Sequence, residues 1–276
     1  MNYAQAISRY EDQLSSIGEE KESLSYIFRE IKGWDYTKFI LHQAKEIKAA
    51  DLELMEEIML QLKQHIPAQY ITGQVHFSDL VLLVNQHVLI PRPETQELVQ
   101  LILAENDAAS SKVLDIGTGS GAIALSLAKE RASWDITASD ISEKALEVAR
   151  ENAQINHLTV AFLHSDVFSH ISEKFDILVS NPPYIALEDK KEVEKNVLLH
   201  EPHLALFADQ DGLAVYQNIA ENAAQHLSSK GKIYLEIGYK QGQKVVRLFE
   251  DYFPEKRVRL LQDIFGKDRM VVVDDG

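Results

Sequence analysis

The residue types best suited to chemistry lie in two short stretches of the chain. The first is a glycine-rich loop, Asp115–Gly121, between an apolar segment expected to be a strand and a segment expected to be a helix. Glycines there permit a tight turn and let a ligand approach the backbone closely. The second is the tetrapeptide Asn181-Pro182-Pro183-Tyr184, which follows another apolar segment. Both stretches therefore end buried strands, where ligands of α/β proteins bind.

The tetrapeptide suits a planar nitrogen that is a weak nucleophile because its lone pair is delocalised. The side-chain carbonyl of Asn181 and the main-chain carbonyl of Pro182 could each accept one N–H of an amide or amino group. Proline has no N–H to compete, and its fixed φ aims that carbonyl. Tyr184 could pack on the flat group. Positioning of this kind supplies up to ~7–11 kcal/mol in well-oriented systems, so the pattern implies no strong general base.

The glycine loop admits two interpretations. Gly117-x-Gly119-x-x-Ala122 fits a dinucleotide fingerprint, with Asp140 standing ~20 residues further on. The fuller pattern, Asp-x-Gly-x-Gly-x-Gly, resembles the first motif of class I S-adenosylmethionine-dependent methyltransferases. A pyrophosphate favours backbone donors and a helix N-terminus, whereas S-adenosylmethionine has no phosphate and carries a sulfonium and an ammonium. Asp115 could face that cationic end, or it could cap the loop.

Two later carboxylates also follow strand-like segments. Asp140 closes the segment Trp134–Asp140 and could accept hydrogen bonds from both ribose hydroxyls, or it could cap the next helix. The glycine loop upstream favours the ribose role. Asp166 follows Val160–His164 and could contact an adenine amino group, with Val167 or Phe168 packing on the ring edge. A plain turn explains these last residues equally well.

From residue 112 the chain alternates strand and helix, which predicts a doubly wound α/β fold with a largely parallel sheet covered on both faces. Predicted strands are Lys112–Ile116, Asp135–Ser139, Val160–His164, Phe175–Ser180, Lys232–Ile237, Arg257–Gln262 and Met270–Val273. Predicted helices are Ala122–Glu130, Glu143–Asn156, Leu213–Leu227 and Gly242–Tyr252.

The preceding residues divide into two further regions. Residues 1–66 are expected to be helical, because apolar residues recur at the helical period. These are Leu24, Ile27, Phe28 and Ile31, and then Leu52, Met55, Met59 and Leu62. Residues 67–93 look like a short antiparallel connector built from Val75–Phe77, Leu80–Val84 and Val88–Ile90. It ends at Pro91-Arg92-Pro93, and a helix is expected from Glu94 onward.

Composition excludes several classes of function. The 276 residues include no cysteine, so disulfides, thiolate catalysis and cysteine-ligated metals are excluded, and the spacing of the histidines predicts no metal site. A net charge of −15 argues against direct nucleic-acid binding. No apolar stretch approaches the ~18–20 residues that span a bilayer, and the N-terminus lacks a signal pattern. We therefore expect a cytoplasmic protein with no membrane contact.

The tetrapeptide resembles the (Asp/Asn)-Pro-Pro-(Tyr/Phe) signature of methyltransferases that act on planar nitrogens. The chain as a whole resembles the HemK/PrmC family of peptide-chain-release-factor glutamine N5-methyltransferases. The segments that carry this resemblance are Tyr70–Gly73, Ile90–Thr95, Asp115–Gly121, Asn181–Tyr184, Glu201-Pro202 with Ala205-Leu206, and Leu235–Gly238. Departures from the family pattern are Gln96, His200 and Val167.

This resemblance implies a helical substrate-recognition domain over 1–66, a β-hairpin linker over 67–93 and a methyltransferase domain over 94–276. That last domain would hold a seven-stranded sheet whose last strand is antiparallel. The enzyme would methylate the glutamine of the Gly-Gly-Gln motif in class 1 release factors, using S-adenosylmethionine, and we expect it to be a monomer. Two alternatives stay open from the residues: an adenine-N6 methyltransferase of DNA or RNA, and a non-catalytic dinucleotide-binding module.

Residue roles follow by position. The expected cofactor-binding residues are Asp115, Gly117, Thr118, Gly119, Ser120, Gly121, Asp140, Asp166, Val167 and Asn181. The glutamine amide would be held by Asn181, Pro182, Pro183 and Tyr184, of which Asn181, Pro182 and Tyr184 are the expected catalytic residues. Arg92 and Glu201 could line the substrate channel or order the chain around it, and both roles stay open.

Overall fold

The computed structural model describes residues 1–276, which form two compact units. The first unit contains Met1–Gln74 and Glu194–His200, and the second contains Val75–Val193 and Glu201–Gly276. The segment expected as a linker, residues 67–93, contributes its short helix to the first unit and most of its remainder to the second. None of the helices combines the length and the apolar character that crossing a membrane would need.

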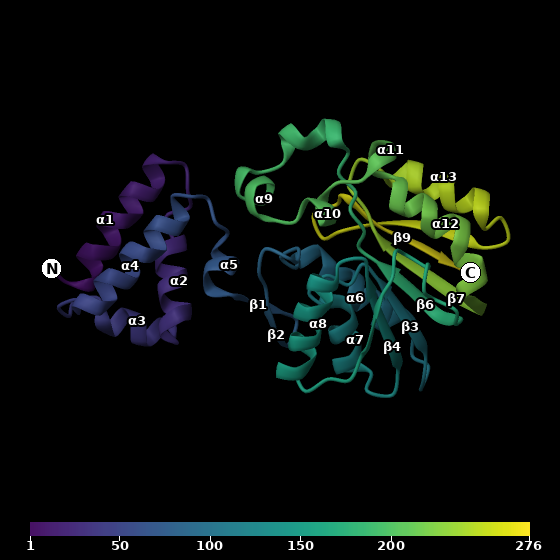
Figure 1. The fold of residues 1–276 in the computed structure, drawn as a ribbon, viewed down its shortest axis with the longest axis horizontal. Coiled ribbons are helices and arrows are strands. Elements are labelled where there is room, and N and C mark those ends of the chain that lie inside the picture. Colours follow the sequence, from purple (N-terminus) through teal and green to yellow (C-terminus); the bar gives the residue numbers. More distant parts are fainter. The chain divides into compact units, whose positions relative to one another are not determined.

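The first unit is a small helical bundle (Figure 1). Its helices are α1 (Tyr3–Ser16), α2 (Ser23–Lys32), α3 (Tyr36–His42), α4 (Ala49–Leu62), α5 (Ala68–Thr72) and α9 (Lys195–His200). The helical spacing in α2 places Leu24, Ile27 and Phe28 in the core, as predicted. Ile31, expected on the same face, is 45% exposed, because it lies in the last turn of a short helix.

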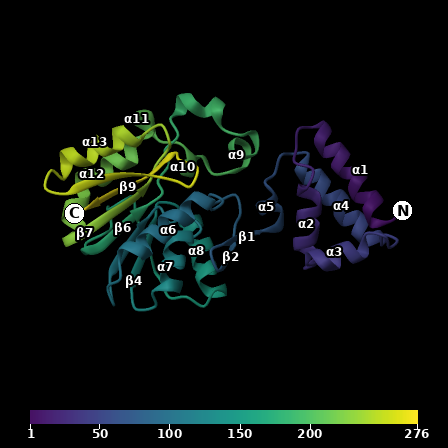
Figure 2. The ribbon, with the colours of Figure 1, turned by 180° about the vertical axis from the view of Figure 1, so that it is seen from behind.

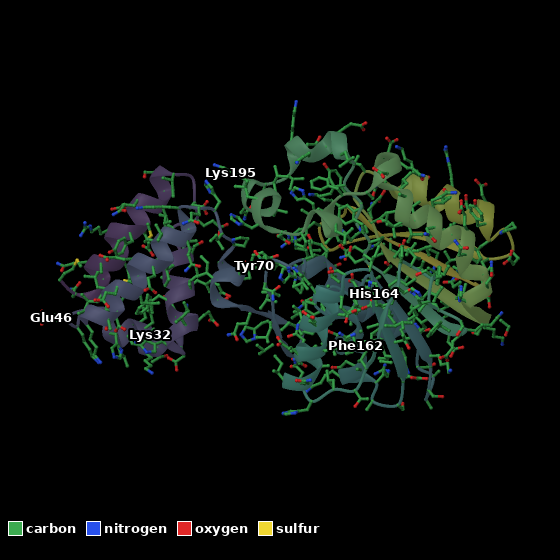
Figure 3. The ribbon with its side chains drawn as sticks, viewed as in Figure 1. Lys32, Glu46, Tyr70, Phe162, His164 and Lys195 are labelled. Carbon is green, nitrogen blue, oxygen red and sulfur yellow. The ribbon has the colours of Figure 1, made fainter.

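Helix α9 belongs to the first unit through polar contacts near the end of α4. The Lys195 ammonium lies 2.9 Å from Nε2 of His65, whose other ring nitrogen pairs with Glu19. His200 Nε2 lies 2.8 Å from the main-chain oxygen of Gln64. Lys195 is labelled on this helix in Figure 3. A segment distant in sequence thus contacts the first unit through polar groups.

The second unit is built around a seven-stranded sheet in the order β5-β4-β3-β6-β7-β9-β8. The strands are β3 (Lys112–Ile116), β4 (Asp135–Asp140), β5 (Ala161–His164), β6 (Phe175–Ser180), β7 (Leu227–Glu236), β8 (Arg257–Gln262) and β9 (Asp268–Asp274). Pairing is parallel from β5 to β7, whereas β9 is antiparallel to both of its neighbours. The predicted seven-stranded sheet with an antiparallel last strand is confirmed.

Helices cover both faces of this sheet, which confirms the doubly wound layout (Figure 2). One apolar layer contains α6 (Pro93–Glu105), α7 (Ala122–Glu130) and part of α8 (Glu143–Ile155). The opposite layer contains α12 (Ala214–His226) and α13 (Gly242–Tyr252). Alternate strand residues enter opposite layers, as Val113 and Leu114 do. Phe162 and His164 are labelled on edge strand β5 in Figure 3.

Shorter elements connect these layers. Strands β1 (Gln74–Phe77) and β2 (Leu80–Leu83) form a separate two-stranded sheet. The prediction of a further strand at Val88–Ile90 is wrong: this segment is irregular, and its Ile90 N–H donates to a side chain, Glu201, rather than to a strand. A 3₁₀ helix, η1 (Leu187–Glu192), α10 (His203–Leu206) and α11 (Asp209–Gly212) lie between β6 and α12.

Candidate active site

The two chemical motifs lie side by side because their strands are neighbours. Ile116 at the end of β3 pairs in register with Ser180 at the end of β6, and also with Ser139 of β4. The loops that follow these strands therefore leave the sheet at one edge. A cavity of about 230 Å³ opens there, within the second unit.

This cavity brings together most of the residues predicted from the sequence. The predicted site residues that line it are Gly117, Thr118, Gly119, Ser120, Asp140, Asp166, Val167, Asn181, Pro182 and Pro183. Asp115, Gly121 and Tyr184 do not line it. No Lys or Arg side chain is among the lining residues, whereas two carboxylates are. The wall is thus anionic and lacks the cations that often accompany a pyrophosphate.

The glycine loop is held in a conformation that favours glycine. The φ angles of Gly117 and Gly119 are 73° and 56°, in the left-handed region that side chains disfavour. A Cβ built on either residue would meet no atom within 4 Å, so backbone conformation, not crowding inside the protein, explains the glycines. The loop is anchored below by N–H groups of Gly117 and Thr118 that donate to the Ser139 oxygen. Its exposed backbone can therefore approach a ligand closely.

Asp115 has the second of its two proposed roles, that of a loop cap. Its Oδ2 accepts from the Thr118 hydroxyl at 2.6 Å and from the Ala124 N–H at 3.2 Å. The side chain is fully buried beneath the loop, and burial raises its pKa to about 7. Its Oδ1 has no hydrogen-bond partner. Asp115 thus joins the loop to the first turn of α7 without reaching the cavity.

Asp140 lies on the cavity wall and also braces the glycine loop. Its Oδ2 accepts from the Gly119 N–H at 2.9 Å, and its Oδ1 accepts from the Ser142 N–H at 2.8 Å. Burial raises the pKa of this carboxyl, whereas the hydrogen bonds from backbone N–H groups lower it. Ser142, not Asp140, caps α8 through its bond from the Ala145 N–H. Asp140 is thereby fixed at the cavity with lone pairs left to accept from a ligand.

The turn after β5 contributes a strained position to the cavity wall. Val167 has a φ of 46°, which is rare for a β-branched residue and typically costs ~1–3 kcal/mol. Its main-chain oxygen accepts from the Ser165 hydroxyl at 3.1 Å, and its side chain packs into the second core layer. Asp166, beside it, is exposed and lines the cavity.

The tetrapeptide divides into a cavity-facing part and an anchored part. Asn181, Pro182 and Pro183 line the cavity. The ring of Tyr184 packs instead against the second core layer, and burial raises its pKa to about 12. Its main-chain oxygen accepts from the Gln241 side chain at 2.9 Å. In this structure Tyr184 therefore holds the loop in place, and its predicted contact with a flat acceptor remains a prediction.

Arg92 and Glu201 form an ion pair at the end of the predicted linker. Oε1 of Glu201 lies 2.5 Å from the Arg92 guanidinium, and its Oε2 accepts from the Ile90 N–H at 3.1 Å. Only 1% of the Glu201 side chain is exposed. Neither residue lines the cavity, so the geometry favours the ordering role over the channel role.

Comparison with known proteins decides the family. The chain is 57% identical to the release factor glutamine methyltransferase of Streptococcus pneumoniae (strain ATCC BAA-255 / R6), over 100% of this chain and 99% of that relative. The chain belongs to the family of release factor glutamine methyltransferases. The family member of Lactococcus lactis subsp. lactis (strain IL1403) is 50% identical over 94% of this chain and 96% of its own length.

Domain families agree with this assignment. A family described as the methyltransferase small domain matches residues 94–207, and one described as the PrmC N-terminal domain matches residues 5–73. A methyltransferase from Pyrococcus furiosus has a similar structure, with a TM-score of 0.55 and 19% identity over 72% of this chain and 90% of that one. At that identity the likeness supports the fold alone. The resemblance inferred from the sequence motifs is confirmed.

Two further residues beside the tetrapeptide were given no role by the sequence reasoning. Thr95 of α6 and Glu236 of β7 are both buried and connect to Asn181 through hydrogen bonds. The signal for Glu236 was an acidic residue between the apolar run Ile233–Leu235 and Ile237. Thr95 ends the segment Ile90–Thr95, one of those that carry the family resemblance, but no role was predicted for it.

Proposed function

We propose that this chain transfers a methyl group from S-adenosylmethionine to the side-chain amide nitrogen of the glutamine in the Gly-Gly-Gln motif of class 1 release factors. The observation that carries the proposal is one cavity lined by both the glycine loop and Asn181–Pro183. Relatives at up to 57% identity over the whole chain bear the name release factor glutamine methyltransferase.

The cavity residues fit the donor. S-adenosylmethionine supplies a methyl group on a cationic sulfur and has no phosphate. The anionic wall, with Asp140 and Asp166 and no Lys or Arg, suits such a cation. The open backbone at Gly117 and Gly119 leaves room that a Cβ would take. We assign the donor to Gly117, Thr118, Gly119, Ser120, Asp140, Asp166, Val167 and Asn181, with Asp115 and Gly121 shaping the loop from behind.

The acceptor is held by the tetrapeptide. Asn181 Oδ1 and the Pro182 oxygen each accept one N–H of the glutamine amide, which keeps the nitrogen lone pair directed at the methyl group. The nitrogen–methyl bond forms as the sulfur–methyl bond breaks, and the nitrogen then loses a proton to solvent. The second proline, Pro183, stiffens the segment, and Tyr184 anchors it.

The first unit is proposed to recognise the protein substrate. Its helix α3 exposes three apolar side chains, Tyr36, Ile40 and Leu41, of which Tyr36 and Leu41 are about two-thirds exposed. A contiguous exposed apolar patch is typical of a protein-binding surface, and we propose that these three side chains form one. We further propose that the enzyme works as a cytoplasmic monomer, because its substrate acts in translation, and that it contacts neither membrane nor nucleic acid directly.

Mass spectrometry of a purified class 1 release factor, after incubation with labelled S-adenosylmethionine and this protein, tests the proposal. A gain of one methyl group on the Gly-Gly-Gln glutamine is expected, with no transfer to DNA or RNA assayed in parallel. Transfer to adenine in DNA or RNA instead would overturn it. Calorimetry should detect binding of S-adenosylmethionine but not of NAD, and the reverse result would favour a dinucleotide-binding module.

A further inference from the structure

Asn181 is linked to a buried carboxylate through one hydroxyl. Its Nδ2 donates to Thr95 Oγ1 at 3.2 Å, and Thr95 Oγ1 donates to Glu236 Oε2 at 2.7 Å. Thr95 and Glu236 are 4% and 1% exposed, so solvent does not compete for these bonds. The side chain of Asn181 also favours the ionised form of Glu236 and so lowers its pKa, against the effect of burial.

The order of donors along this relay follows from the chemistry of its last member. An ionised carboxylate can only accept hydrogen bonds, so the single hydroxyl proton of Thr95 must go to Glu236. The Thr95 oxygen is then left as an acceptor on the side of Asn181. An amide can present either an NH₂ or a carbonyl, but only the NH₂ satisfies that acceptor. The relay therefore fixes which end of the Asn181 amide faces inward.

We propose that Thr95 and Glu236 are positioning residues that turn the Oδ1 of Asn181 toward the methyl-accepting amide. The inference rests on the proposed function, because Oδ1 matters only if the substrate presents an N–H there. With the amide reversed, NH₂ would face the NH₂ of the substrate, two donors would oppose each other, and the acceptor pair with Pro182 would be lost. Thr95 lines the cavity and Glu236 does not; in this assignment both act on the acceptor through Asn181.

The relay also depends on the charge of Glu236. Arg269 of β9 favours the ionised form, Glu94 of α6 opposes it, and Tyr184 and Tyr216 pack nearby, with the Tyr216 hydroxyl donating to the Glu236 main-chain oxygen at 2.8 Å. Burial outweighs these bonds and charges and raises the pKa of Glu236 to about 7. Below that pH a protonated Glu236 can donate to Thr95, and the constraint on Asn181 is released.

The first test removes the hydroxyl of the relay. Thr95→Val keeps the shape of the side chain, whereas Thr95→Ser keeps the hydroxyl. We expect Thr95→Val to lower kcat about tenfold or more, equivalent to ~1.4 kcal/mol, with the donor Kd unchanged. Thr95→Ser should recover most of the loss. The release-factor assay of the unmodified chain is run first, so that failure of the proposed function is recognised separately.

Tyr234 offers a matched control for loss of stability. Its buried hydroxyl accepts from Asn106 Nδ2 at 2.9 Å and donates to Glu105 at 3.1 Å, the same amide–hydroxyl–carboxylate arrangement away from the cavity. Tyr234→Phe should lose stability without a tenfold loss of kcat. If Thr95→Val retains the kcat of the active wild type, or if Tyr234→Phe loses as much kcat, the positioning role is overturned.

The second test is the pH profile. Wild-type kcat should fall as the pH drops through about 7, because Glu236 then gains a proton. Glu236→Gln does not titrate and can either donate to Thr95 or accept from it, so the order of donors is no longer fixed; its kcat should be lowered by up to about tenfold at pH 8 and should not fall further as the pH drops through about 7. A wild-type profile that is flat between pH 6 and 8, or an identical limb in Glu236→Gln, would overturn the dependence on this carboxylate.

Discussion

Substitution of Gly212 by alanine should damage the acceptor loop from a distance. Gly212 ends α11 with a φ of 79°. A Cβ built there would lie 2.2 Å from the Tyr184 main-chain oxygen and 2.8 Å from its carbonyl carbon. Both neighbours are backbone atoms, so neither can move without moving the tetrapeptide. Gln241, whose Nε2 would lie 2.7 Å away, can turn aside only by giving up its bond to the same Tyr184 oxygen.

The magnitude follows from two separate costs. A side chain in the left-handed conformation costs ~1–2 kcal/mol, and overpacking a filled site typically costs a further ~1–3 kcal/mol. Gly212→Ala should therefore destabilise the fold by about 2–5 kcal/mol. Gly266 has a similar φ of 74°, but a Cβ there would meet nothing within 4 Å. Gly266→Ala should show the conformational cost alone, about 1–2 kcal/mol.

Urea unfolding and methyl-transfer kinetics measure the two effects. A shift of the acceptor loop by ~1 Å can cost ~100-fold in rate, so kcat of Gly212→Ala should fall by one to two orders of magnitude. The glycine loop is untouched, so the Kd for S-adenosylmethionine should stay within about twofold. If Gly212→Ala and Gly266→Ala lose the same stability and the same kcat, the contact between residue 212 and Tyr184 does not determine the position of the acceptor loop.

The remaining predictions concern Asn181, the ion pair of Arg92 with Glu201, the buried Glu236 and the first unit. Asn181→Ala should lower kcat at least tenfold, while calorimetry still finds donor binding because the other seven residues assigned to the donor are unchanged; near-wild-type turnover would count against the acceptor pair. Arg92→Ala should lower the free energy of unfolding, measured in urea, by about 2 kcal/mol, because the buried Glu201 keeps only the Ile90 N–H as a donor. The loss is smaller than for a fully buried ion pair, because one third of the Arg92 side chain is exposed to solvent. Since burial raises the pKa of Glu236 from 4.5 to about 7, the folded state holds a proton that the unfolded chain has released, and stability falls as the pH rises across that interval. Glu236→Gln should therefore be more stable than wild type at pH 8, by up to ~3 kcal/mol, with little difference at pH 4.5. Leu41→Asp should raise KM for whole release factor and leave that for a short Gly-Gly-Gln peptide unchanged; a KM for whole release factor equal to that of the wild type would exclude α3 as a docking surface.

Much of the fold and of the candidate site could be predicted from local sequence. Buried parallel strands read as continuous apolar runs, and helices between them repeat at their own period, so element order was visible. The predicted strands Lys112–Ile116, Phe175–Ser180 and Arg257–Gln262 have the bounds that the structure gives. Val88–Ile90 was misread as a strand, since apolar β-branched residues also fill a buried irregular segment.

The sequence by itself determined that a glycine loop and an Asn-Pro-Pro-Tyr tetrapeptide end two strands, because each motif is contiguous and constrains its own backbone. Only the tertiary structure decided which carboxylate reaches the cavity, Asp140 rather than Asp115, and that the Tyr184 side chain packs against the second core layer. It alone brought Thr95, Asn181 and Glu236 together across 86 and 141 residues of chain. Strand order places β3, β6 and β7 side by side, and no local periodicity records which strands become neighbours.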